Sequence, residues 1–266
     1  MPETILEKPS LPYEELADVI DLSLLTGQLL LQHGADTARI ESTVHHIGTG
    51  LGCTWLDILV SPNALIITTT SGDQFRTKIR RVTRLGVNMA MIVTINDLSR
   101  RVYAGELDRF TLRKELEAAI DAKPEYNRWI VVAMVGLACG AFSQLFGGDW
   151  AVFVMTVIAS GMAMFVRQEL AHRFFNIYIM VTATAFVATL VAGFALMLNL
   201  SENPTIALSA SVLLLVPGVP LINAAEDMIQ GHALIGLVRG VIGGLISVSI
   251  ALGIIIAMTL LRIEGV

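Results

Sequence analysis

The residues best suited to chemistry in this chain lie where a strongly apolar segment ends. The helix-breaking and polar residues of that stretch are, in order, Pro217, Gly218, Pro220, Asn223, Glu226 and Asp227. A proline inside a helix removes a backbone donor and clashes with the carbonyl one turn back, so both prolines are expected to kink or break the helix. Within a bilayer, backbone groups freed by a break persist only where protein or a water-lined cavity satisfies them. Broken helices beside carboxylates are a recurring way to build a site for a small solute.

The polar residues after the break, together with Arg239 in the next apolar segment, are the candidate substrate-binding or gating residues. Asn223 would hydrogen-bond a substrate, and Asp227, one turn later on the same face, would bind a substrate amine or a proton. Arg239 would balance that charge, with Glu226 as a second partner, or hold a substrate carboxylate, because a buried unpaired charge in a membrane is costly. The alternative is that the prolines only kink the helix, the acids cap its end and Arg239 snorkels to the membrane surface.

Other groupings of reactive side chains are weak. Glu41 and His45 are one helical turn apart with His46 adjacent, and Glu169 and His172 have the Glu-x-x-His spacing of carboxylate-bridged metal sites. Neither group has the further ligands that such sites need, and no nucleotide-binding loop, nucleophile elbow or zinc-protease motif occurs. We expect no catalytic residue, no metal and no cofactor, and a membrane-anchored enzyme is the least favoured class.

A run of basic residues accompanies one predicted strand. It consists of Arg76, Lys78, Arg80, Arg81 and Arg84. These side chains either attract an anionic metabolite or lipid headgroups, or they form an ordinary solvated face of the sheet.

Composition divides the chain into two parts. It is 54% hydrophobic, with a mean hydropathy of +0.68, which is too apolar for an ordinary soluble protein. From Trp129 to Leu261 the charged residues are only Asp149, Arg167, Glu169, Arg173, Glu202, Glu226, Asp227 and Arg239. We therefore predict a soluble domain over residues 1–127 and a transmembrane domain over residues 128–266. The first part has no basic excess, so nucleic acid is not expected as a partner.

Hydrophobic periodicity predicts an α+β fold for the soluble domain. The expected helices cover residues 13–33, 38–51, 89–103 and 111–122, and the expected strands cover residues 54–60, 65–70 and 74–81. Asp36 or Thr37 is placed to cap the second helix, and Asp108 to cap the last one.

The second part predicts about five transmembrane helices. They cover residues 129–146, 150–166, 177–198, 206–223 and 234–261, each near or above the ~20 residues that cross a bilayer. Lys123 and Arg128 precede the first span, Arg167 and Arg173 follow the second, and the loops on the other side have no basic residue. Basic loops stay in the cytoplasm, so the soluble domain is expected there and the C-terminus on the far side. No cleaved signal peptide is expected.

Small residues and cysteines complete the pattern. Gly136 and Gly140, and a ladder of Gly236, Gly240 and Gly244, are expected to let helices pack closely. Cys53 and Cys139 fall in different parts of the chain and are expected to be reduced thiols rather than a disulfide.

Three stretches together resemble the threonine/serine exporter family. They are His33-Gly-Ala-Asp-Thr-Ala-Arg-Ile-Glu-Ser-Thr43, Gly86-Val-Asn-Met89 and Val216-Pro-Gly-Val-Pro-Leu-Ile-Asn-Ala-Ala-Glu-Asp-Met-Ile-Gln-Gly-His232. The chain is similar to the larger subunit of the two-component branch, which includes the succinate exporter of enteric bacteria and works with a small all-membrane partner.

The resemblance implies proton-driven efflux of a small hydrophilic metabolite across the bacterial inner membrane. A dicarboxylate such as succinate and an amino acid such as threonine or serine both fit. A homo-oligomer is the alternative to the small partner. A regulatory or accessory subunit, whose cytoplasmic domain senses a metabolite, is the alternative to a transporting one.

Overall fold

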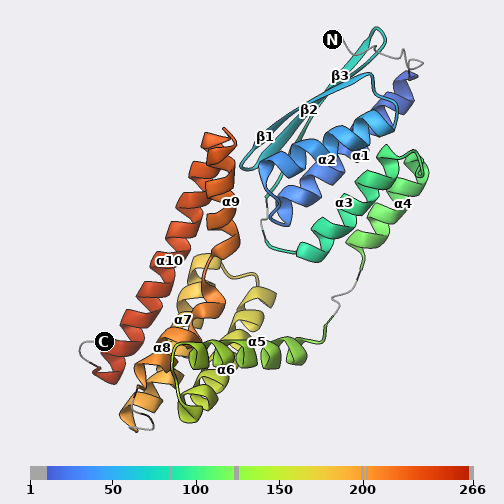
Figure 1. Cartoon of the computed structure of the whole chain (residues 1–266). Helices are drawn as coiled ribbons and strands as arrows, with labels where there is room; N and C mark the ends of the chain where they lie inside the picture. The colour runs from blue at the N-terminus through green and yellow to red at the C-terminus, as the bar shows by residue number, and fades with distance from the viewer. Residues whose placement is uncertain (1–10, 84–85, 123–125, 199–200, 202, 264–266) are drawn as a thin grey trace. The chain divides into compact units, whose positions relative to one another are not determined.

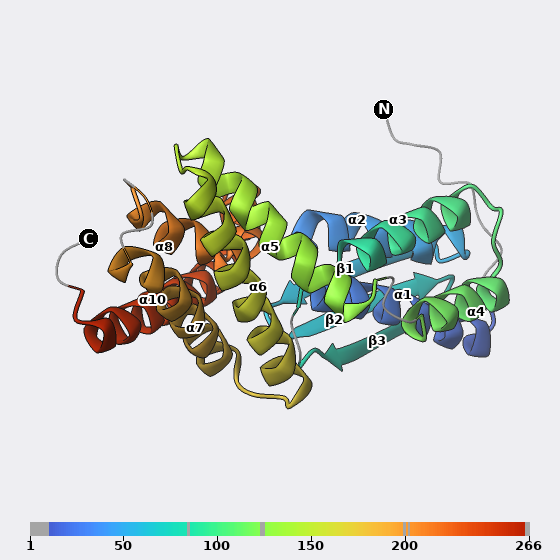
Figure 2. The ribbon, with the colours of Figure 1, turned by 90° about the horizontal axis from the view of Figure 1, so that it is seen from below.

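The structure is a computed structural model that describes residues 11–83, 86–122, 126–198, 201 and 203–263 (Figures 1 and 2). Most of the chain is helical, with one small sheet near the N-terminus, which confirms the predicted fold class. The chain forms two compact units. The first comprises residues 1–123 and 219–240, and the second comprises residues 124–218 and 241–266. Residues 219–240, which were assigned to the transmembrane domain, thus pack within the unit that contains the sheet.

The elements before residue 123 lie within a few residues of their predicted positions. They are α1 (Tyr13–Gln32), α2 (Thr37–Gly50), β1 (Trp55–Ser61), β2 (Ala64–Ser71), β3 (Gln74–Arg81), α3 (Met89–Tyr103) and α4 (Arg109–Ile120). The first unit also contains nearly all of α9 (Gly218–Ile229), which the predicted span over residues 206–223 covers only in part, and the first two turns of α10 (Ala233–Leu261). The predicted caps of α2 and α4 are confirmed. Asp36 Oδ1 accepts from Arg39 N at 2.8 Å, and Asp108 Oδ1 accepts from Thr111 N at 2.9 Å. Hydrogen bonds from Thr111 lower the pKa of Asp108.

The antiparallel sheet has the order β1-β2-β3 and packs one face against α1 and α2. Leu65 and Ile67 of β2 are fully buried on that face. β3 turns basic side chains toward α1: Lys78 Nζ lies 2.6 Å from Asp21 Oδ1, and Arg80 Nη1 donates to Gln28 Oε1 at 3.3 Å. Two residues of the basic run therefore serve sheet-to-helix packing, while Arg84 lies outside the described residues.

The second unit is built from apolar helices. They are α5 (Arg128–Leu145), α6 (Trp150–His172), α7 (Ile177–Met197), α8 (Thr205–Ser211), the 3₁₀ turn η1 (Leu213–Leu215) and the rest of α10. In the described part of the chain, four helices are long and apolar enough to cross a membrane, or five if α8 and α9 count as one broken span.

Glycines bring α5 and α6 together, as predicted. A Cβ built on Gly136 would lie 2.9 Å from the Val157 carbonyl oxygen, and one on Gly140 would lie 2.5 Å from a Val157 methyl group. The second ladder packs in part: Gly236 lies against Ala224 and Met228 of α9, whereas a Cβ on Gly244 would meet nothing described within 4 Å.

Both cysteines are buried thiols. Cys53 is 1% exposed in the first unit and Cys139 is 4% exposed in the second, and no disulfide joins them. That both thiols are reduced in the cell stays a prediction.

Candidate functional site

The broken span owes its shape to Pro217. The residue has no N–H, so the Leu213 carbonyl has no helical donor four residues later and accepts from Val216 N at 3.2 Å instead. The helix therefore tightens into the η1 turn and stops, and α9 starts at Gly218. The expectation that both prolines break the helix is wrong for Pro220. It lies in the first turn of α9, where the backbone N–H groups have no helical acceptor and a proline is tolerated.

The break also leaves the Leu214 carbonyl without a helical donor, and Arg167 donates to it instead. Gly218 N donates to Val216 O at 2.8 Å rather than to Leu214 O. Arg167 Nη1, from α6, donates to Leu214 O at 3.2 Å. Arg167 is half-buried, and no described carboxylate lies within ion-pair distance of it, since the nearby Glu169 pairs with Arg128 and Arg173.

Three of the candidate residues after the break contact the loop between α1 and α2. Asp227, wholly buried, accepts from Thr37 N through Oδ1 at 3.0 Å. Arg239 Nη1 lies 2.9 Å from Asp227 Oδ2, and Arg239 Nη2 donates to Ala35 O at 2.8 Å. Asn223 Nδ2 donates to Gly34 O at 2.7 Å. We call these three side chains, with loop residues 34–37, the clasp.

Electrostatics favour the clasp in two ways. Asp227 and Asp36 both accept backbone N–H groups at the start of α2, where a negative charge complements the helix dipole. The Arg239 guanidinium neutralises Asp227 inside the fold, with its side chain only 13% exposed. Their facing atoms, Nη1 and Oδ2, are close enough for an ion pair but lack the alignment of a hydrogen bond.

The loop is held from its other side by the segment between β3 and α3. Gly86 N donates to Gln32 O at 2.7 Å, and Asn88 N donates to His33 O at 3.1 Å. The three sequence stretches that carry the family resemblance therefore meet around this loop. The second and third stretches each hydrogen-bond to the backbone at or next to the first.

The remaining candidates lie apart from the clasp. Glu226 is exposed and accepts from Gln230 Nε2 at 3.3 Å. Glu41 faces His232, with Oε2 3.7 Å from Nε2. Burial raises the pKa of Glu41, and His232 opposes that shift. In the described residues, no three His, Cys, Asp or Glu side chains gather as a metal site would require.

The sequence model of the family described as "Putative threonine/serine exporter" matches residues 21–261. The chain belongs to the threonine/serine exporter family. No solved structure matches it.

Two relatives in this family match almost from end to end. The "Probable succinate transporter subunit YjjP" of Klebsiella aerogenes is 40% identical over 249 residues, which cover 93% of this chain and 95% of the relative. The protein of the same name in Escherichia coli K12 is 37% identical, covering 95% of this chain and 98% of the relative.

A more distant relative is longer. The "Probable threonine/serine exporter" of Mycobacterium tuberculosis is 23% identical, over 90% of this chain but only 46% of the relative. The chain is therefore a multi-pass membrane protein of a transporter family. The two relatives that match almost from end to end are named as subunits.

Proposed function

We propose that this chain is the larger subunit of a two-component exporter of a small carboxylate-bearing metabolite. A dicarboxylate such as succinate is the first candidate cargo, and threonine or serine is the second. The observation that carries the proposal is the broken span, in which Arg167 of α6 holds the carbonyl freed at Leu214. The names of the relatives support export, and two of them support succinate.

Arg167 is proposed as the residue that binds the substrate carboxylate. A guanidinium presents several N–H donors in a plane that matches a carboxylate, and such charged pairs are stronger than neutral hydrogen bonds. Leu214 O occupies one of those donors. An arginine in an apolar helix gains most from an anion because the alternative is a poorly compensated charge. Binding would draw the guanidinium away from Leu214 and so loosen the broken span.

The clasp is proposed as the gate rather than as the substrate site. The clasp side chains already donate hydrogen bonds to residues 34–37, or accept them, which leaves little capacity for a substrate at Asn223, Asp227 and Arg239. Asn223 and Asp227 follow Pro217 by six and ten residues along the chain. Pro217 and Gly218 would therefore act as the hinge, and release of the clasp would let α9 move. Pro220 would start α9, and Glu226 would remain at its exposed side.

Partner, location and driving force complete the proposal. A small all-membrane partner would supply further spans, which is supported by the word "subunit" in two relatives and by the greater length of the mycobacterial one. Basic residues before α5 and after α6 favour a cytoplasmic location for the sheet-bearing domain in the bacterial inner membrane. Coupling to the proton gradient is part of the proposal through the family resemblance.

Reconstitution tests the proposal. Proteoliposomes would contain this chain, its small membrane partner or both, and would be loaded with labelled succinate, threonine or serine. We expect flux only with both proteins, faster for succinate than for threonine or serine, and only until an uncoupler is added. Flux from this chain alone would overturn the two-subunit arrangement. Flux from the partner alone, changed only in rate by this chain, would instead establish the regulatory alternative.

A further inference from the structure

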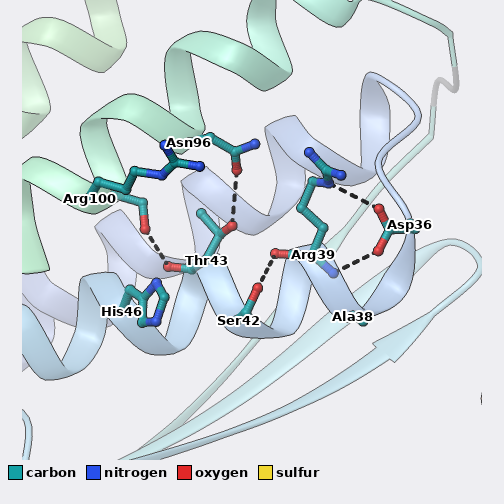
Figure 3. Close-up of a pocket in the computed structure, with 9 residues that line it drawn as sticks. Asp36, Ala38, Arg39, Ser42, Thr43, His46, Asn96 and Arg100 are labelled. Carbon is teal, nitrogen blue, oxygen red and sulfur yellow. Dashed lines mark hydrogen bonds and ion pairs between the residues drawn. The ribbon is translucent and has the colours of Figure 1, made fainter. Parts of the chain in front are cut away.

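A polar pocket lies on the first unit, between α2 and α3 (Figure 3). Its volume is about 480 Å³, within the range of small-molecule sites. The lining residues are Asp36, Ala38, Arg39, Ser42, Thr43, His46, Asn96, Ser99 and Arg100. Apart from Ala38, every one of them carries a polar or charged group.

Two arginines give the pocket its positive character. Figure 3 shows the Arg39 and Arg100 side chains on either side of Thr43 and Asn96. Arg100 is exposed and has no ion-pair partner among the described residues. Arg39 Nε lies 3.0 Å from Asp36 Oδ2, which uses only part of its guanidinium.

Neutral donors lie between the two charges. Thr43 Oγ1 donates to Asn96 Oδ1 at 3.3 Å, which leaves the Asn96 amide hydrogens for a ligand. Ser42 adds an exposed hydroxyl, which donates to Arg39 O at 3.2 Å and can rotate to donate to a ligand instead. Charged donors at two positions with neutral donors between them match a small anion that has oxygens at both ends.

We propose that this pocket binds a small organic dicarboxylate and that the bound anion regulates the clasp. The proposal rests on the proposed function in one respect: the regulatory anion belongs to the same chemical class as the exported cargo. Arg100 would hold one carboxylate and Arg39 the other, with Asn96 and Ser42 between them. An exporter controlled in this way would open when its cargo accumulates on the side of the sheet-bearing domain.

The path to the clasp is short. Asp36 lines the pocket and lies between Ala35, whose carbonyl Arg239 holds, and Thr37, whose N–H Asp227 holds. An anion in the pocket would compete with Asp36 for Arg39 and so alter the cap of α2. Because coupling between two sites is reciprocal, weakening the clasp must change the affinity of the pocket.

Titration of the full-length chain in lipid nanodiscs with succinate tests the proposal. The Arg167→Gln background removes the proposed transport site, so the remaining heat of binding reports the pocket. We expect Arg100→Gln to weaken binding by about tenfold, the loss expected for one charge-assisted contact, and Arg100→Lys to restore part of it. Arg81→Gln, an exposed arginine on β3, is the matched control and should bind like the background.

Two other probes check the ligand class. The uncharged diamide of succinate should not bind, and inorganic phosphate should bind more weakly than succinate. Absence of succinate binding, equal binding by Arg100→Gln, or phosphate binding as tight as succinate would each overturn the proposal. If efflux persists while the pocket binds nothing, the pocket is wrong and the exporter stands. If the pocket binds succinate while no efflux occurs, the proposed function is wrong and the pocket stands.

Discussion

Two arginines of apolar helices differ in how their charge is satisfied. Arg239 meets a wholly buried carboxylate, Asp227, at 2.9 Å and a backbone carbonyl at 2.8 Å. Arg167 meets a single backbone carbonyl at 3.2 Å and, in the described part of the chain, no carboxylate. The first charge is neutralised within the fold, while the second has binding capacity to spare. We infer that Arg239 serves architecture and gating, whereas Arg167 is the better candidate to meet a substrate anion.

The largest effect on stability is expected from Asp227. Asp227→Ala leaves Arg239 buried without its partner and Thr37 N–H without its acceptor, a change that costs about 3–5 kcal/mol in buried ion pairs. Thermal unfolding of the purified chain in detergent measures the loss. The double variant Asp227→Leu with Arg239→Met should recover part of it, because two apolar side chains leave no unpaired charge, while Thr37 N–H and Ala35 O stay without these partners. A single variant as stable as the wild type would remove the distinction between the two arginines.

Arg167→Gln is expected to reverse the pattern, with a large loss of efflux and a small loss of stability. Losing one charged hydrogen bond costs about 1.5–3 kcal/mol at most, whereas losing the substrate contact should lower efflux about tenfold or more. The efflux rate of Arg167→Lys should lie between that of Arg167→Gln and that of the wild type. Arg173→Gln, at the exposed end of α6, is the matched control. Efflux by Arg167→Gln at the rate of this control would show that Arg167 only caps the broken span.

A variant of Asn223 tests whether this residue belongs to the clasp or to the substrate site. Asn223→Ala leaves the Gly34 carbonyl without its donor, so the chain should lose about 1–3 kcal/mol of stability. Gln230→Ala removes an exposed amide that directly follows the same helix and donates to Glu226, and it should change stability by less than about 0.5 kcal/mol. Equal stability of the two variants would place Asn223 outside the clasp.

The smallest expected effect is a pH dependence at Glu41. Burial raises the pKa of this carboxyl in the fold, so the folded chain holds its proton to higher pH than the unfolded chain does. Its contribution is complete below the ordinary carboxyl pKa and is lost as the pH rises through the raised value. Glu41→Gln should thus match the wild type at low pH and gain stability relative to it above that window. The gain should be about 0.5 kcal/mol or less, since the side chain is 35% exposed. Thermal unfolding across this pH range measures it, and a gain that shrinks as the pH rises would contradict the assignment.

Local features of the fold could be predicted because they depend on neighbours in the chain. The caps at Asp36 and Asp108 and the break at Pro217 each follow from residues within one helical turn. Pro220 shows the limit of that reasoning, because its effect depends on where the next helix begins. Pro220, five residues after the end of η1, is typical of a helix breaker in the sequence but lies in the first turn of a new helix in the fold.

The partners of the candidate residues could not be predicted in the same way. Asp227 and Thr37 are hydrogen-bonded although 190 residues separate them in the sequence, and Asn223 and Gly34 although 189 do. Hydrophobic periodicity gives no information on such long-range pairs. From the sequence, Arg167 indicates only the orientation of the chain in the membrane. The signal for a further role is that Arg167 lies in the apolar sequence of α6, while the nearby Glu169 pairs with Arg128 and Arg173.

The burial of both native thiols has a practical consequence for membrane topology. A water-soluble maleimide should react little with Cys53 or Cys139, which are 1% and 4% exposed. A cysteine introduced at exposed Phe175, after α6, should therefore be labelled in inside-out vesicles, and one at exposed Phe146, after α5, in intact spheroplasts. The opposite labelling would show that the chain has the inverse orientation in the membrane. Cargo would then reach Arg167 from the other side.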